Sequence, residues 1–253
     1  MPNVHSRFGY SAVSTYEQCP FRYKCQYLDG LKTLPNTDPA NALIIGTALH
    51  TGIETDVETA IQQYFASYPI ITDQHVDEEI KLRNVIPKVK EVIPDGLHEV
   101  RVVDKNFIGT LDLLVPVGNG WYDLYDFKYS NNRDRYMESR QLHLYKYYFE
   151  KTTGNRIDNM RFVFVPKVQI RQKKTEDLFQ FRQRLQAELD TVNVTVEPVE
   201  YDPQKVIDHL ELTQDITSCT DYPKNPTRLC DFCEFQQYCE SDGKEDWMIY
   251  GKT

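Results

Sequence analysis

The sequence predicts a mixed α/β (α+β) fold, in which one β-sheet is flanked by helices. Helical patterns fill the first part of the 253-residue chain, strand patterns begin near Glu99, and helices and strands then alternate up to a cysteine-rich tail. A chain of this length with 40% hydrophobic residues can bury a sizeable core. We therefore expect one domain over residues 1–253, with its core at about residues 41–200.

Helices are expected before the sheet. The first runs from about Thr15 to Leu28 and is interrupted at Pro20, because proline lacks the amide that a helix interior needs. The second runs from Asn41 to about Ser67, because apolar residues recur there at every fourth position, on one helical face: Leu49, Ile53, Val57, Ile61 and Phe65. His50 lies on a neighbouring face of this second helix.

The sheet is expected to begin as a three-stranded antiparallel meander. Its first strand carries Val100 and Val102, its second runs from Phe107 to Val115, and its third runs from Trp121 to Tyr129. The sequence Gly-Asn-Gly at residues 118–120 is typical of a tight hairpin turn.

Further helices and strands are expected after the meander, so that helices flank the sheet. In chain order they are a helix from about Asp134 to Lys151, a strand from Phe162 to Val165, an amphipathic helix from about Glu176 to Asp190, and a strand near Val192 to Val196.

Two aspartates and a lysine predict a site on this meander. Asp126 and Lys128 are two residues apart on one strand, so their side chains point to the same face. Asp112 faces them if the middle strand pairs in the register that its turn allows. Either aspartate alone would more simply be a surface carboxylate. Both lie among apolar or aromatic residues, however, where an unpaired charge is costly to bury, and this favours a site.

These residue types suit the hydrolysis of phosphodiesters. That reaction needs a bound cation, an activated water and neutralisation of the charge that develops on the phosphate. Asp112 and Asp126 can supply oxygen ligands to Mg²⁺ or Mn²⁺, and the carbonyl of Phe127 is a third candidate ligand. Lys128 can orient the water or stabilise the developing charge.

The charge of the chain limits how it could bind nucleic acid. A formal net charge of −9 argues against a protein that coats nucleic acid indiscriminately, because such binding relies on neutralising phosphates. A local groove remains compatible with this value. One candidate strip holds Lys167, Arg171, Lys173 and Lys174, although a solvated loop explains these residues at least as well.

The cysteines are arranged as a metal site that joins the two ends of the chain. The six cysteines are too few and too unevenly placed for a disulfide scaffold. Four of them form a pattern: Cys19 lies near the start of the chain, and Cys230, Cys233 and Cys239 lie close together near its end. We therefore expect residues 14–30 and 219–243 to form a clasp that binds a metal group. Four thiolates bind either Zn²⁺ or a [4Fe–4S] cluster, and spacing alone slightly favours zinc. Cys25 and Cys219 lie outside the pattern and are expected to be ordinary buried thiols.

The sequence contains no sign of membrane insertion or export. No segment approaches the roughly 18 apolar residues of a membrane span, and the first residues do not form a signal segment. We therefore expect no membrane partner and a cytoplasmic location, in the host if the gene belongs to a phage.

Four short motifs resemble the PD-(D/E)XK nuclease superfamily and, within it, the RecB-type exonucleases. Gly46–His50 is similar to the helical Gly-x-x-x-His element of that group, and Gly109–Asp112 is similar to its Gly-x-x-Asp strand. Asp126–Lys128 matches Asp-x-Lys, and Gln141–Tyr145 matches Gln-x-x-x-Tyr. All four occur in the order typical of the family, and the resemblance spans nearly the whole chain.

The resemblance assigns roles to further residues. It implies that His50 is a metal ligand, and that Gln141 and Tyr145 contact DNA or support the site. The cysteine pattern is similar to the iron–sulfur clasp of AddB-type nuclease domains and of the CRISPR-associated adaptation exonucleases. The resemblance therefore favours a [4Fe–4S] cluster over zinc.

The resemblance implies a DNA exonuclease that uses Mg²⁺ or Mn²⁺, acts on single-stranded ends and serves DNA recombination, repair or processing. The chain has no Walker-type motif and therefore no helicase motor of its own. Two alternatives stay open: a structure-specific endonuclease that uses the same site, and a non-catalytic DNA-binding subunit of a repair or adaptation complex. The sequence leaves the polarity of digestion and the oligomeric state open.

Overall fold

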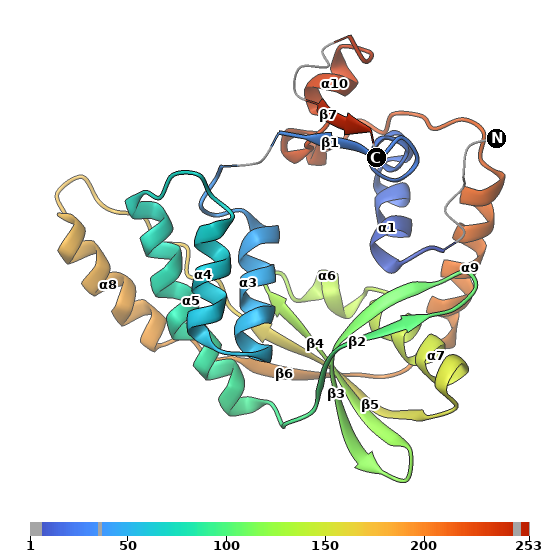
Figure 1. The fold of residues 1–253 in the computed structure, drawn as a ribbon, viewed down its shortest axis with the longest axis horizontal. Helices are drawn as coiled ribbons and strands as arrows, with labels where there is room; N and C mark the ends of the chain where they lie inside the picture. Colours follow the sequence, from blue (N-terminus) through green and yellow to red (C-terminus); the bar gives the residue numbers. More distant parts are fainter. Residues whose placement is uncertain (1–6, 35–36, 245–248, 253) are drawn as a thin grey trace.

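A five-stranded sheet forms the centre of the molecule (Figure 1). The computed structural model describes residues 7–34, 37–244 and 249–252. In spatial order, the strands of the sheet are β2 (Leu97–Val103), β3 (Ile108–Gly118), β4 (Trp121–Tyr129), β5 (Arg156–Val165) and β6 (Thr195–Val199). The strand β5 runs parallel to β4, and the other neighbours are antiparallel. The predicted α/β fold and its antiparallel meander are confirmed.

Helices cover both faces of the sheet (Figure 1). On one face, buried side chains of the sheet such as Phe127 and Val163 pack against α3 (Ala42–Glu54), α4 (Val57–Ala66), α5 (Asp73–Val92) and α8 (Leu178–Asp190). On the other face, Leu124 and Phe162 pack against α7 (Gln141–Thr153) and α9 (Pro203–Ser218). Side chains alternate between faces along each strand, so β4 contributes to both cores.

Two predicted helices are each divided in two. The helix expected at residues 41–67 is interrupted between α3 and α4, where the carboxylate of Asp56 accepts a hydrogen bond from the amide of Thr59 (2.9 Å) and caps α4. The helix expected at 134–151 consists of α6 (Asp134–Met137) and α7. Apolar residues at every fourth position continue across the first break, from Ile53 to Val57, which is why periodicity alone did not reveal it.

The N-terminal helical region starts earlier than predicted. It comprises α1 (Tyr10–Gln18), α2 (Pro20–Tyr23) and a π-helical turn, η1 (Lys24–Leu28). The predicted interruption is present, because Cys19 is extended between α1 and α2. The helices α5 and α9 were not predicted.

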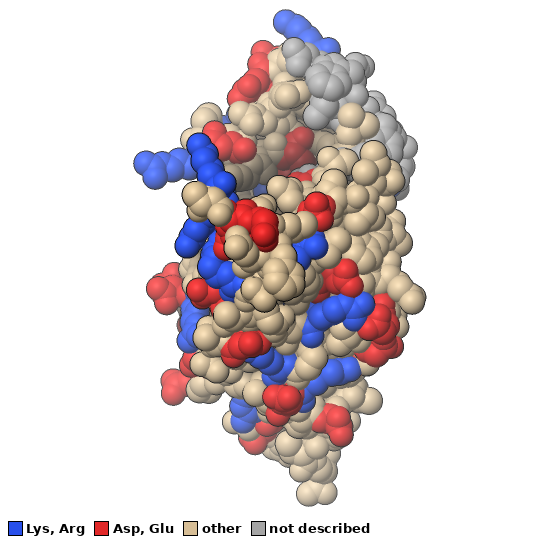
Figure 2. Space-filling view, turned by 90° about the vertical axis from the view of Figure 1, so that its left-hand side faces the viewer, with Lys and Arg blue, Asp and Glu red and all other residues tan. Residues whose placement is uncertain are grey.

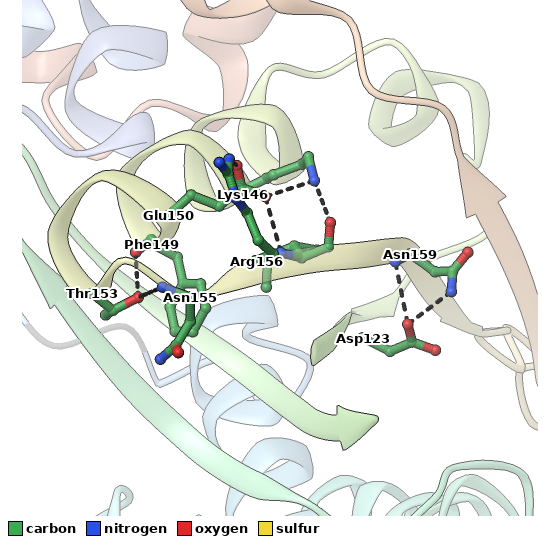
Figure 3. A network of polar contacts seen from close by, with 9 residues as sticks. Asp123, Lys146, Phe149, Glu150, Thr153, Asn155, Arg156 and Asn159 are labelled. Atoms are coloured by element: carbon green, nitrogen blue, oxygen red, sulfur yellow. Dashed lines mark hydrogen bonds and ion pairs between the residues drawn. The ribbon is translucent and has the colours of Figure 1, made fainter. Parts of the chain in front are cut away.

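Polar contacts fix α7 against the beginning of β5 (Figure 3). The Glu150 carboxylate accepts hydrogen bonds from the amide of Ile157 (2.9 Å), from Lys146 (2.8 Å) and from Arg156 (3.1 Å). Charge-assisted bonds of this kind hold a helix more firmly than neutral ones. The C-terminal end of α7 is therefore anchored to the sheet, and its first turns project Gln141 and Tyr145 over β3 and β4.

The segments near the two ends of the chain lie together (Figure 1). The strand β1 (Leu31–Thr33) pairs with β7 (Ile249–Lys252), and Arg22 forms an ion pair with Glu234 at 2.9 Å. The C-terminal part also contains η2 (Arg228–Phe232) and α10 (Gln236–Glu240). Within the described ranges, no helix is both long and apolar enough to cross a membrane.

Candidate functional site

Three neighbouring strands bring three carboxylates into one row. His98 lies opposite Leu113, and Leu113 lies opposite Tyr125. Glu99 follows His98, Asp112 precedes Leu113 and Asp126 follows Tyr125, so the three carboxylates lie at neighbouring positions of adjacent strands. The Asp112 carboxylate also accepts a hydrogen bond from the amide of Phe127 at 2.8 Å, which ties β3 to β4 at this point.

His50 reaches the row of carboxylates from α3. Its Nδ1 lies 3.4 Å from Oε1 of Glu99 and 3.6 Å from Oδ1 of Asp112. Its ring meets that of Phe127 edge to face, with 5.6 Å between centroids, so packing fixes its orientation. His50, Glu99 and Asp112 each offer one ligand atom, and these three atoms all lie within 4.8 Å of one another.

Asp126 is a fully buried carboxylate whose close polar partner among the described residues is Lys128. Its exposed fraction is 0%, and neither oxygen accepts a hydrogen bond of ordinary geometry from the described residues. Its close contact is an ion pair, with 2.5 Å between Oδ2 and Nζ of Lys128. A buried charge with unsatisfied lone pairs is costly, and a bound cation would offset that cost.

Gln141 and Tyr145 hold Lys128 in place. The Lys128 ammonium donates to Oε1 of Gln141 (2.9 Å), and Nε2 of Gln141 donates to the Tyr145 hydroxyl (3.0 Å). Lys128 also lies 5.2 Å from the centre of the Tyr136 ring. Hydrogen bonds thus join Gln141 and Tyr145 on α7 to Lys128 on β4. Gln141 orients the lysine and so supports the site.

Burial and the neighbouring charges shift the pKa values of the site residues. Burial, together with the neighbouring charge of Asp126, raises the pKa of Asp112 to about 7. Burial opposes the charged form of His50, yet Glu99, Asp112 and Asp126 outweigh it and raise the pKa of this imidazole to about 9. For Lys128, burial is likewise outweighed by Asp126 and Asp112, and its pKa is raised. Such shifts are typical of sites where a cation completes the charge balance.

The donor set fits a divalent cation such as Mg²⁺ or Mn²⁺. Carboxylate oxygens are the preferred ligands of both ions, and Mn²⁺ also accepts imidazole. Asp126 adds a buried carboxylate whose Oδ1 has no donor among the described residues, while its Oδ2 pairs with Lys128. The predicted contribution of the Phe127 carbonyl stays a prediction.

Glu99 was missed by sequence reasoning. It follows His98 in a segment that predicts only a strand, and its backbone has φ +50°, a left-handed conformation that is uncommon for a residue other than glycine. Register supplies the signal that could have found it, because His98 lies opposite Leu113 and Val100 opposite Leu111, which puts Glu99 beside Asp112.

The glycines of two motifs differ in their surroundings. A Cβ on Gly109 would lie 2.9 Å from the Tyr145 ring and 3.0 Å from that of Phe107, whereas a Cβ on Gly46 would meet nothing within 4 Å. Gly109 therefore allows Tyr145 to pack directly on β3.

We expect Gly109→Ala to lower the free energy of unfolding by about 1–3 kcal/mol, because the added methyl overpacks the contact with Tyr145. Gly46→Ala is the matched variant and should raise it by up to about 1 kcal/mol, since alanine favours the interior of a helix. Urea denaturation measures both values. Equal effects of the two substitutions would contradict this account.

Four cysteines line one pocket between the terminal segments. Cys19, Cys230, Cys233 and Cys239 surround a volume of about 570 Å³, between α1 and α2 on one side and the segment from Lys224 to Glu240 on the other. Burial raises the pKa of the Cys239 thiol, and the neighbouring Cys19 and Cys230 raise it further.

The sulfur atoms are not gathered as tightly as a single zinc ion requires. Zinc–sulfur bonds of about 2.3 Å place four sulfurs roughly 3.8 Å apart in a tetrahedron. Among the described residues, the three-ligand set found within 4.8 Å consists of His50, Glu99 and Asp112 and contains no cysteine.

The two remaining cysteines lie outside this pocket. Cys25 is fully buried beside Leu31 and Phe235, and burial raises its pKa to about 12. Cys219 ends α9, is half-buried rather than buried, and donates its thiol proton to the carbonyl of Asp221 at 2.8 Å. The expectation of a buried thiol therefore holds for Cys25 and is wrong for Cys219.

The basic strip lies in an irregular loop after β5. Arg171, Lys173 and Lys174 are exposed, whereas Lys167 is half-buried, with its ammonium 5.1 Å from the centre of the Tyr129 ring. Figure 2 shows that basic and acidic side chains are mixed on the side of the molecule that carries α8. The loop resembles a solvated segment more than a continuous basic groove.

Comparisons with known proteins agree with this geometry. A family model, the PD-(D/E)XK nuclease superfamily, matches residues 7–240, which include every site residue discussed above. None of the curated proteins matches the chain. The fold is similar to the crystal structure of a candidate exonuclease from Eubacterium rectale, with a TM-score of 0.53 and 12% identity, covering 90% of this chain and 92% of that one. At this identity the likeness shows a shared fold alone.

Proposed function

Because the chain belongs to the PD-(D/E)XK nuclease superfamily, we propose that this nuclease is a DNA exonuclease that uses Mg²⁺ or Mn²⁺ and acts on single-stranded ends. Its role would be in DNA recombination, repair or processing. The observation that carries the metal-dependent reaction is Asp126, a fully buried carboxylate that pairs with Lys128, lies beside Asp112 and still has lone pairs without a partner among the described residues.

Each residue has a role that follows from its position. His50, Glu99, Asp112 and Asp126 would hold the cation, with the Phe127 carbonyl as a further ligand. When bound there, the cation would supply polarisation of a phosphate oxygen and activation of a water molecule. Lys128, oriented by Gln141, would bind the phosphate through its ammonium and neutralise the charge that develops there. Tyr145 would keep Gln141 in the required orientation.

Digestion of end-labelled DNA tests this proposal against its alternatives. Single- and double-stranded substrates, each linear and circular, are incubated with Mg²⁺ or Mn²⁺. An exonuclease degrades linear single strands and spares circles. Cleavage of circles or of flap junctions would favour the structure-specific endonuclease, and binding without cleavage would favour a non-catalytic subunit.

We expect Glu99→Gln to weaken Mn²⁺ binding and to lower cleavage, because the amide keeps the size of the side chain but loses its charge beside His50 and Asp112. A loss of about 10-fold or more in metal affinity corresponds to about 1.4 kcal/mol. Titration of Mn²⁺ by calorimetry measures it. Glu54→Gln, on the helix that carries His50, is the control and should bind Mn²⁺ as the wild type does. Unchanged binding by Glu99→Gln would exclude Glu99 as a ligand.

The cysteine pocket is proposed to hold a [4Fe–4S] cluster, with Zn²⁺ as the alternative. The four thiols line one pocket, which supports a shared metal group, and the resemblance of the cysteine pattern favours the cluster. On this proposal residues 1–253 form one nuclease domain, whose segments 14–30 and 219–243 are clasped together. The clasp would also be the part available to recombination, repair or adaptation partners.

A further inference from the structure

A second pocket adjoins the nuclease site. It has a volume of about 440 Å³ and lies between the start of α1, the aromatic residues of α2 and η1, and the first residues of β3. Thr110 and Tyr145 both line it. Thr110 is two residues from Asp112 on β3, about 7 Å along an extended strand. A single nucleotide can span that distance.

The pocket presents hydrogen-bond donors. Tyr23 is only 1% exposed and lines the pocket, and its hydroxyl has no hydrogen-bond partner among the described residues. The Tyr145 hydroxyl accepts from Gln141, but within the same set of residues its own proton has no acceptor. Both hydroxyl groups are thus free to donate to a ligand.

The start of α1 adds further donors and a positive charge. Its first amides, at Tyr10 and Ser11, have no acceptor within the helix, and Gly9 has no side chain to cap them. Arg7 lines the same pocket. A helix N-terminus beside an arginine favours an anion such as phosphate. The half-buried Tyr27 also lines the pocket, and its ring stacks on the buried ring of Tyr23 with 5.3 Å between centroids, so its orientation is fixed and it can pack beside a base.

We propose that this pocket binds the terminal nucleotide of a single DNA strand, with its phosphate at the start of α1 and its base beside Tyr27. This inference rests on the proposed nuclease function and adds a substrate position to it. The bound end would fix the distance between the terminus and the cleaved bond. Tyr145 joins the pocket to Lys128 through Gln141, so an occupied pocket contacts the same hydrogen-bonded chain that orients the lysine.

Binding of thymidine 5′-monophosphate to the full chain, without added divalent metal, tests the proposal. We expect saturable binding by the wild type and by Asp126→Asn, and weaker binding of thymidine, which lacks the phosphate. Ser11→Trp fills the pocket from an exposed position of α1 and should weaken binding by about 10-fold or more, which is about 1.4 kcal/mol. Tyr23→Phe keeps the ring and should also bind more weakly. Gln62→Trp, on exposed α4, is the control and should bind as the wild type does.

Product length gives a second measurement. Ser11→Trp should change the lengths of the fragments released from linear single strands, which a purely structural role would not do. If the wild type does not bind the nucleotide, or if Ser11→Trp binds it as tightly as the wild type does, the proposal that this pocket binds a nucleotide is wrong. The proposed nuclease function would be unaffected. Cleavage at the wild-type rate by Asp126→Asn would instead overturn the metal site and leave the nucleotide measurement unaffected.

Discussion

Asp126→Asn is expected to abolish DNA cleavage while the protein remains folded. The substitution keeps the shape of the side chain but removes the charge that would bind the cation and pair with Lys128. Loss of such a group costs several kcal/mol in the transition state, or about 10²-fold or more in rate. Asp112→Asn and Lys128→Ala should have effects of the same order, and His50→Ala a smaller one. Release of labelled nucleotides, with circular dichroism to monitor folding, measures these effects.

Asp123 provides a matched control on the same strand. It is also a buried aspartate of β4, but it forms an ion pair with Arg161 at 2.6 Å and accepts hydrogen bonds from Asn159, so its role is structural. Asp123→Asn should lower stability yet keep the rate of cleavage per folded molecule. Wild-type cleavage by Asp126→Asn, or equal losses from both substitutions, would show that the site has been assigned to the wrong residues.

The sequence predicted the sheet better than the helices that surround it. Alternation of side chains and a Gly-Asn-Gly turn determine the register of a meander, so the proximity of Asp112, Asp126 and Lys128 could be predicted from local patterns. Breaks between helices depend on single caps such as Asp56, which apolar periodicity does not reveal. The mainly polar helix α5 was missed, although Leu82, Ile86 and Val89 pack deep in the core.

The site was predicted incompletely for a related reason. Residues within a motif share one element, and their spacing predicts their orientation. Glu99 lies outside the motifs and reaches His50 and Asp112 through pairing between strands and a left-handed backbone. The pocket beside Tyr145 likewise combines residues distant in sequence, such as Arg7 and Thr110. Such long-range combinations require the fold.

Cys19→Ala is expected to give a colourless protein that is more sensitive to protease and cleaves DNA more weakly. If the four pocket cysteines share a cluster, Cys19 closes a loop of almost the whole chain with Cys230, Cys233 and Cys239. Links that close long loops remove the most entropy from the unfolded chain, so the loss of one ligand should loosen the whole fold. Wild-type protein purified without oxygen should be brown and hold about four iron atoms per chain. Visible absorbance, iron analysis and limited proteolysis measure these effects.

Cys25 and Cys219 separate the cluster from a general effect of losing a thiol. Cys219→Ala removes a half-buried thiol outside the pocket and should behave as the wild type does. Cys25→Ala leaves a small cavity beside Leu31 and Phe235, so a small loss of stability with full colour is expected. If Cys25→Ala bleaches the protein and Cys19→Ala does not, the N-terminal ligand is Cys25. If the wild-type protein is colourless and contains one zinc ion per chain, the four cysteines form a zinc site and not a cluster. The nuclease site would be unaffected, because none of these cysteines lies among its residues.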